Sequence, residues 1–137
     1  MLRCSCNAPA AMRKGLRLLP VCVLLSLLTA CITHSITNLT ATSAPRNPNN
    51  QYLIEYAWDT TQQSIRPISV TPHVIVGFDS YPMRPILKMT NRWEAYVPCP
   101  PDKNEIVYHF KVDYEYSRFG KPGQASKLSP EYKLVIK

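Results

Sequence analysis

Glycine is scarce in this 137-residue sequence, with four in all: Gly15, Gly77, Gly120 and Gly123. Phosphate-binding loops need several glycines close together so that the backbone can approach the phosphate groups, and these four do not form such a cluster. The sequence also lacks a Gly-x-Ser-x-Gly nucleophile elbow and a His-Glu-x-x-His zinc motif. With none of these catalytic motifs present, we predict that the protein is not an enzyme.

A hydrophobic run long enough to span a membrane is also missing. The longest apolar stretch, Leu18 to Ala30, has 13 residues and contains Pro20, whereas a spanning helix needs about 20. Four basic residues precede it, Arg3, Arg13, Lys14 and Arg17. A basic start followed by a short apolar core is typical of a secretory signal peptide, whether translation begins at Met1 or Met12.

The end of this leader carries a specific motif, Leu28-Thr29-Ala30-Cys31. It resembles the lipobox of bacterial lipoproteins, in which a leucine, two small residues and a cysteine follow one another. The resemblance implies cleavage before Cys31, a thioether-linked diacylglycerol on its sulfur and usually an acyl chain on its amino group. It also implies a lipid-anchored cell-envelope protein. Ile32, in place of aspartate, favours the outer membrane by resemblance to enterobacterial sorting.

Two alternatives to this interpretation are an uncleaved anchor and a leader that is cut elsewhere. On the lipoprotein interpretation, residues 1–30 are the signal peptide, residues 31–35 a lipidated tether, and residues 36–137 the folded domain. Removing residues 1–30 leaves 107 residues, which is enough for one domain with a single core.

Cysteine is nearly absent from the mature chain. Of the five cysteines, Cys4, Cys6 and Cys22 belong to the leader and Cys31 would carry lipid. Cys99 alone remains, so no disulfide can form within the domain. A reactive thiol is one interpretation of Cys99. We favour a small, half-buried apolar residue, because no histidine or basic residue lies beside it in the sequence to activate the sulfur.

The formal charge of +7 overstates the basic character of the mature chain. Four of the 16 basic residues lie in the leader, which leaves 12 against nine acidic residues, a net charge of +3. This excess is scattered and forms no run of lysine and arginine. We therefore expect no nucleic-acid partner and no polybasic membrane signal.

Eleven of the 13 prolines lie after Cys31, where they break most windows long enough for a helix. Short stretches alternate between apolar and polar residues instead, which is typical of strands. About seven strands are predicted, at residues 36–42, 51–58, 65–70, 72–79, 91–97, 106–116 and 131–137. This number of short strands with proline-rich turns favours an all-β, two-sheet sandwich of the immunoglobulin type.

Three of these predictions carry detail that a structure can test. Pro67 demotes residues 65–70 to an edge strand or bulge. The apolar run of residues 74–78 is typical of a central strand buried on both faces, with a turn at residues 80–82. Residues 119–123 form a loop in which Gly120 and Gly123 permit positive φ.

A second resemblance joins three segments: residues 73–79, ending Gly77-Phe78-Asp79; residues 92–97, containing Trp93-Glu94; and residues 106–113. They are similar to early-set immunoglobulin-like domains, most of all to starch- and glycogen-binding modules. The resemblance implies the sandwich fold, with Trp93 in the core. Tyr81 stands where those modules usually carry an exposed tryptophan, and their second sugar-stacking tryptophan is not evident.

The candidate site residues are few. The side chains of His109, Lys111, Asp113 and Glu115 share one strand face, but His109 and Asp113 are about 13 Å apart along it. This spacing is too wide for one metal ion and indicates a solvated sheet face, so no metal or other cofactor is expected.

Tyr81 and Phe119 lie in predicted turns. They are the candidate contacts to a ligand or partner, unless they fold back over the end of the sandwich. The sequence thus predicts a monomeric, non-catalytic interaction or assembly module, whose partner is an envelope protein or a polysaccharide. The alternative is an α-glucan-binding module.

Overall fold

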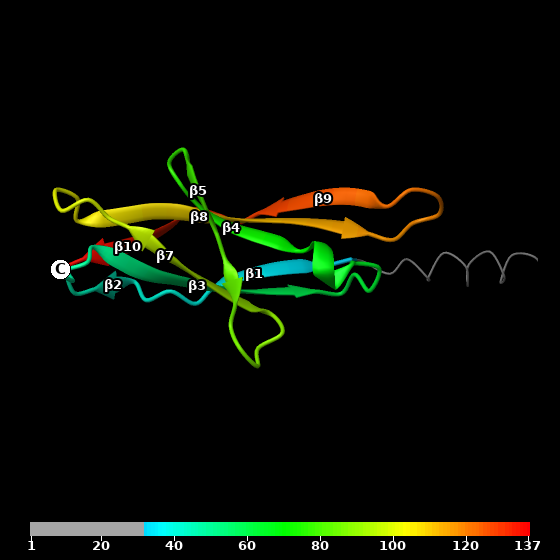
Figure 1. The fold of residues 1–137 in the computed structure, drawn as a ribbon, viewed down its shortest axis with the longest axis horizontal. Helices are drawn as coiled ribbons and strands as arrows, with labels where there is room; N and C mark the ends of the chain where they lie inside the picture. The colour runs from blue at the N-terminus through cyan, green and yellow to red at the C-terminus, as the bar shows by residue number, and fades with distance from the viewer. Residues whose placement is uncertain (1–31) are drawn as a thin grey trace, which may run out of the picture. The chain divides into compact units, whose positions relative to one another are not determined.

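The computed structural model describes residues 32–137, which form one compact unit. The predicted signal peptide and Cys31 lie outside the described residues. The described part is built of β-strands, with one short 3₁₀ helix at Pro67–Ser69 (Figure 1). Among residues 32–137, the structure contains no helix with the length and apolar composition that a membrane crossing requires.

The strands form two sheets. The first is antiparallel and contains, in spatial order, β1 (His34–Asn38), β3 (Gln51–Thr60), β7 (Arg92–Pro98) and β6 (Arg84–Pro85). The second contains, in spatial order, β2 (Ser43–Ala44), β10 (Tyr132–Ile136), β8 (Glu105–Tyr116), β4 (Thr71–Val76) and β5 (Asp79–Pro82). Strand β9 (Gly123–Leu128) also pairs with β8, while β2 and β10 are parallel.

This strand order is that of an immunoglobulin domain. Immunoglobulin sandwiches place strands A, B, E and D in one sheet and C, F and G in the other. Here β1, β3, β7 and β6 take the first four positions, and β4, β8 and β10 take the other three. Tyr108 of β8 lies at the position of the tyrosine corner, but its hydroxyl donates to the side chain of Asn38 in β1, at 3.2 Å, and not to nearby backbone. The predicted immunoglobulin-like two-sheet sandwich is confirmed.

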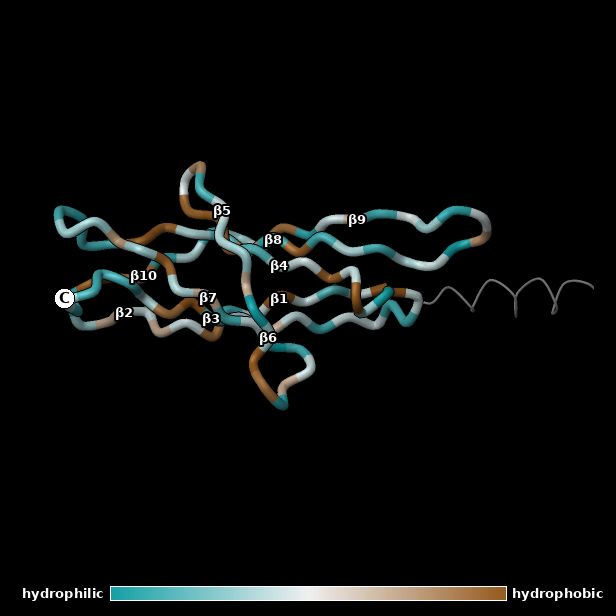
Figure 2. Tube along the Cα trace, viewed as in Figure 1, coloured by the Kyte–Doolittle hydropathy of each residue, from teal (hydrophilic) through white to brown (hydrophobic). Residues whose placement is uncertain are grey.

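The core is made by the inward faces of β3 and β8, as the alternation predicts. Hydrophobic residues recur along these strands between hydrophilic ones (Figure 2). The buried side chains are Tyr52, Ile54, Tyr56 and Trp58 from β3, and Ile106, Tyr108, Phe110, Val112 and Tyr114 from β8. Burial of each large side chain contributes about 1.5–3 kcal/mol. Trp93, predicted to lie in the core, is half-buried and packs against its edge.

Tyr56 and Phe110 join the two sheets at the centre of this core. Their rings stack with centroids 4.6 Å apart, and both residues are 0% exposed. In antibody domains the strands that correspond to β3 and β8 are joined by a disulfide. An aromatic contact links them here.

A β-bulge divides the last strand into β9 and β10. Leu128 faces Lys111 and Tyr132 faces Tyr108, so residues 129–131 oppose two residues of β8. The bulge is closed around Phe110, whose N–H donates to Ser129 Oγ at 2.8 Å and whose carbonyl accepts from Ser129 N–H at 2.9 Å. The one extra residue reverses which side chains face inward. The inward-facing residues are therefore odd-numbered in β9 and even-numbered in β10.

Two predicted strands were wrong in their detail. Residues 65–70 do not form a strand: Ile65 makes a single bridge to Tyr116, and Pro67–Ser69 is a 3₁₀ turn. The fixed φ and missing N–H of Pro67 suit the first position of such a turn. The first strand, predicted at residues 36–42, begins two residues earlier, at His34, and ends four residues earlier, at Asn38.

The predicted central strand at residues 72–79 is also corrected. It ends at Val76, and Gly77-Phe78 turns the chain into β5, which is the edge strand. Gly77 has a φ of +60° at the first central position, as a type II′ hairpin turn requires. Residues 80–82, predicted as a turn, belong to β5.

Candidate binding surfaces

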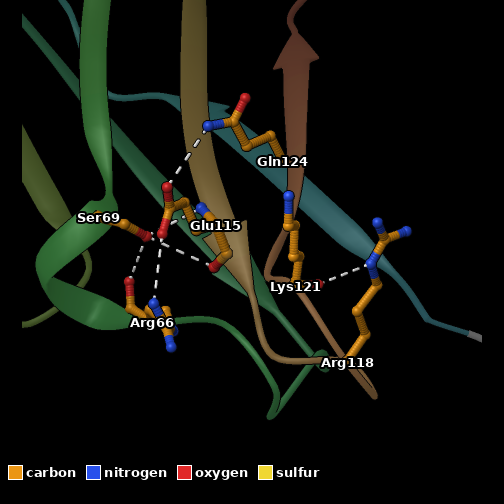
Figure 3. Close-up of polar contacts among 6 residues, drawn as sticks. All are labelled: Arg66, Ser69, Glu115, Arg118, Lys121 and Gln124. Atoms are coloured by element: carbon orange, nitrogen blue, oxygen red, sulfur yellow. Dashed lines mark hydrogen bonds and ion pairs between the residues drawn. The ribbon is translucent and has the colours of Figure 1, made fainter.

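The outer face of β8 is a solvated sheet face, as predicted. His109, Lys111, Asp113 and Glu115 alternate with the buried residues of that strand. The Lys111 ammonium lies 2.9 Å from the Asp113 carboxylate. The Glu115 carboxylate lies 3.5 Å from the Arg66 guanidinium (Figure 3). Within residues 32–137, no group of three histidine, cysteine or acidic side chains is placed to hold a metal ion.

A shallow polar hollow of about 620 Å³ lies beside these residues, between the start of β4 and β9. Its polar groups largely bond to one another. The Ser69 hydroxyl accepts from the Glu115 N–H at 2.8 Å and donates to the Arg66 carbonyl at 2.7 Å, and Gln124 donates to the Glu115 carboxylate at 3.5 Å (Figure 3). These bonds are structural, and they tie the 3₁₀ turn and β9 to β8.

A larger groove, of about 1110 Å³, lies where the β4–β5 turn meets the turns before β3 and between β7 and β8. We call it the β4–β5 groove; it contains Phe78, Tyr81, Asn49, Asn50, Asn104 and Ile106. Tyr81 is half-buried against the core, whereas Phe78 is fully exposed at 107%. An exposed aromatic ring beside amide side chains is a surface on which an apolar or sugar ring can stack.

Cys99 borders this groove but is 2% exposed. Its sulfur lies 3.6 Å from the Lys103 carbonyl, to which the thiol donates. Burial raises the pKa of the Cys99 thiol, although Arg46 and Lys103 nearby act in the opposite direction. The thiol therefore stays protonated at neutral pH and unreactive, as expected of a structural residue. The Cys99 side chain is fully buried, deeper than the half-buried position predicted.

Phe119 lies far from the groove, in the turn between β8 and β9. It is 109% exposed and sits between Arg118 and Gly120, which has a φ of +89°. The Arg118 Nε–H donates to the Lys121 carbonyl at 2.9 Å and closes the turn (Figure 3). Tyr81 and Phe119 thus belong to two separate surfaces: Tyr81 packs back on the core, and Phe119 does not.

His34 and Phe78 are positions that sequence reasoning missed. His34 stacks on Trp58 with ring centroids 6.0 Å apart, and its Nε2 lies 3.3 Å from the Tyr114 hydroxyl. Burial, with a smaller contribution from Lys127, lowers the pKa of His34, so the ring is neutral at neutral pH. For Phe78, the neighbouring glycine and aspartate are turn-forming residues, but the apolar run that ends at Phe78 obscures this signal.

Comparison with known proteins adds little to this description. No protein-family model matches the sequence, and no curated protein matches it. A chain of known structure described as murine CRIg aligns with 14% identity and a TM-score of 0.41, covering 75% of this chain and 98% of that one. The immunoglobulin-like fold is established by the strand order given above.

Proposed function

We propose that this protein is a bacterial lipoprotein, held in the cell envelope by lipid on Cys31, whose immunoglobulin-like domain is a non-catalytic interaction or assembly module. The observation that carries the proposal is the motif Leu28-Thr29-Ala30-Cys31 directly before a domain whose first strand begins at His34. A leader, a lipid site and a folded domain then follow one another without a gap.

Lipid is a sufficient anchor on physical grounds. One acyl chain binds a membrane weakly and reversibly, whereas two or more give stable attachment. The mature charge of +3 is spread over the domain and cannot supply a polybasic signal strong enough to replace the lipid. Attachment should therefore depend on hydrophobic burial of acyl chains, which salt does not weaken.

Extraction of membranes tests this proposal. We expect the full-length protein to stay in the membrane pellet after a wash in concentrated salt and to be released by detergent. Salt screens charge–charge attraction but leaves acyl chains buried. A peripheral membrane protein of the same cells, released by the salt, is the control. Release of this protein by salt would contradict the proposal.

The described surface favours binding over catalysis. Four ion pairs neutralise acidic residues on the exposed sheet surfaces: Arg66–Glu115, Arg84–Glu94, Lys111–Asp113 and Lys133–Glu105. The Cys99 thiol is buried and protonated. What the domain offers instead are two surfaces with a fully exposed aromatic side chain, at Phe78 and at Phe119.

A second candidate function is α-glucan binding. The observation that favours it is the β4–β5 groove, in which Phe78 and Tyr81 lie near three asparagines. Sugar rings stack on aromatic faces, and amide side chains hydrogen-bond their hydroxyl groups.

Affinity electrophoresis in starch and glycogen gels tests this second function. If it is correct, a protein beginning at Ile32 should be retarded, and Phe78→Ala should migrate faster in the polysaccharide gel. Phe119→Ala removes an equally exposed ring outside the groove and should leave migration unchanged. Unretarded migration of the parent protein would exclude α-glucan binding.

A further inference from the structure

The turn between β8 and β9, residues 117–122, has a distinctive composition. We call it the hairpin tip. Its sequence, Ser-Arg-Phe-Gly-Lys-Pro, contains two basic residues and no acidic ones. Arg118 and Lys121 take part in none of the ion pairs formed among residues 32–137. The tip therefore presents one aromatic ring between two cations that the domain itself does not neutralise.

The hairpin tip is held in one shape by local contacts. The Arg118 Nε–H donates to the Lys121 carbonyl at 2.9 Å, and Gly120 takes a positive φ of +89° that most residues avoid. At the base, Gly123 lies directly against the Tyr116 ring, where any larger residue would collide with it. These contacts hold the turn in a shape that directs the Phe119 side chain into solvent.

The hairpin tip lies at the same end of the domain as the start of β1. His34, the first residue of β1, contacts Tyr114 of β8. The Thr61 N–H donates to the Thr33 carbonyl at 3.1 Å, and the Ser117 N–H donates to the Ser64 carbonyl at 2.8 Å. The segment between β3 and β4 therefore bonds both to the residue before β1 and to the first residue of the hairpin tip. Figure 1 shows the hairpin extending beyond the start of β1 along the long axis.

Chain length shows that the hairpin tip can reach the surface on which the domain is anchored. From the level of the His34–Tyr114 contact, β8 runs two residues further to Tyr116, or about 7 Å, before the turn that carries Phe119 begins. Cys31 is three residues before His34 and can lie at most about 11 Å from it. The hairpin therefore projects past the start of β1, at the end of the domain from which the chain leads back to Cys31.

We propose that the hairpin tip docks on the membrane surface into which Cys31 is anchored, with Phe119 among the lipid headgroups and Arg118 and Lys121 against lipid phosphates. This inference rests on the proposed lipid anchor. An apolar phenylalanine ring can bury at the boundary between headgroups and acyl chains, and cations beside it are attracted to anionic lipid. One ring and two charges would bind weakly alone, but the tether makes the contact intramolecular and raises its effective concentration.

Docking at the hairpin tip would fix the orientation of the domain. Strand β8 runs from the β7–β8 turn, which lines the β4–β5 groove, to the tip at its other end. With the tip on the membrane, the groove and Phe78 face away from it. The surface that is free to bind a partner or a polysaccharide would then be turned outward.

Fluorescence quenching by brominated lipid tests the proposal on the full-length, lipidated protein. It is reconstituted in vesicles of phosphatidylethanolamine and phosphatidylglycerol with brominated acyl chains. In Phe119→Trp we expect the emission of the added tryptophan to be quenched relative to unbrominated vesicles. Phe78→Trp places an equally exposed ring at the groove and should be unquenched. The emission of Trp58 and Trp93, measured in the parent protein, is subtracted.

The outcomes separate the two proposals. If the protein sediments with the vesicles but Phe119→Trp is quenched no more than Phe78→Trp, tip docking is wrong and the lipid anchor stands. If the protein carries no lipid and does not sediment, both are wrong. Adding Arg118→Glu and Lys121→Glu to Phe119→Trp should abolish quenching while sedimentation persists, and unchanged quenching would overturn the role of the two cations.

Discussion

Replacing Phe110 with alanine should lower the free energy of unfolding of the domain by about 3–5 kcal/mol. The side chain is 0% exposed and lies where the two sheets meet. Its ring stacks on Tyr56 with centroids 4.6 Å apart and packs edge-on against Tyr108 at 5.5 Å. Alanine would leave a cavity that stiff, hydrogen-bonded strands cannot close. Urea unfolding of the variant and the parent protein measures the difference.

Lys111→Ala is the matched control, one residue along the same strand. The Lys111 side chain is 41% exposed and pairs with Asp113 on the outer face. Its loss should cost under about 0.5 kcal/mol, since exposed ion pairs contribute little. A large loss for Lys111→Ala with a small one for Phe110→Ala would mean that the two faces of β8 are reversed.

Cys31→Ser should abolish lipid attachment. A hydroxyl cannot form the thioether that a lipobox cysteine accepts, so neither the diacylglycerol nor the cleavage that depends on it should occur. Cells given radiolabelled palmitate should label the parent protein and not the variant. Globomycin, which blocks the lipoprotein signal peptidase, should make the parent protein accumulate as a larger precursor.

Cys22→Ser, a change of the same kind within the leader, should keep the palmitate label and normal processing. A Cys31→Ser protein that is still processed at the same place and still bound to the membrane would end the lipoprotein proposal. In that case a surface of the domain itself would have to hold the protein on the membrane, and hairpin-tip variants such as Arg118→Glu test that surface.

The parts of the fold that were predictable from sequence are those in which burial and strand period agree. Strands β3, β7 and β8 each bury one face, so their apolar residues alternate and fix both strand and register. Strand β9 was missed because its residues are polar and mostly exposed, and its hairpin is mostly hydrophilic (Figure 2). It exists because β8 extends beyond β10 and offers unpaired backbone groups to the returning chain.

The candidate surfaces were predictable only in part. Phe119 follows the end of an alternating strand and precedes glycine, so a loop position could be inferred. Phe78 ends an apolar run, and such a run predicts a buried position. The pairing of Val76 with Asp79 places Phe78 in a hairpin turn, where its side chain is exposed to solvent. Tyr81 was predicted to lie in a turn because Pro82 follows it, but Pro82 is tolerated at the edge of the sheet.

The stack of Tyr56 on Phe110 bears on when this domain can fold. A disulfide between the sheets would delay maturation until the chain met an oxidising compartment. Ring stacking needs no oxidant, so the domain can fold equally well in the reducing cytosol where it is synthesised. If the chain is exported, as proposed above, it must cross the membrane before its sheets close. Because sandwich topologies pair distant segments, they fold slowly. On the proposal of export, slow folding would leave time for translocation while the chain is still unfolded.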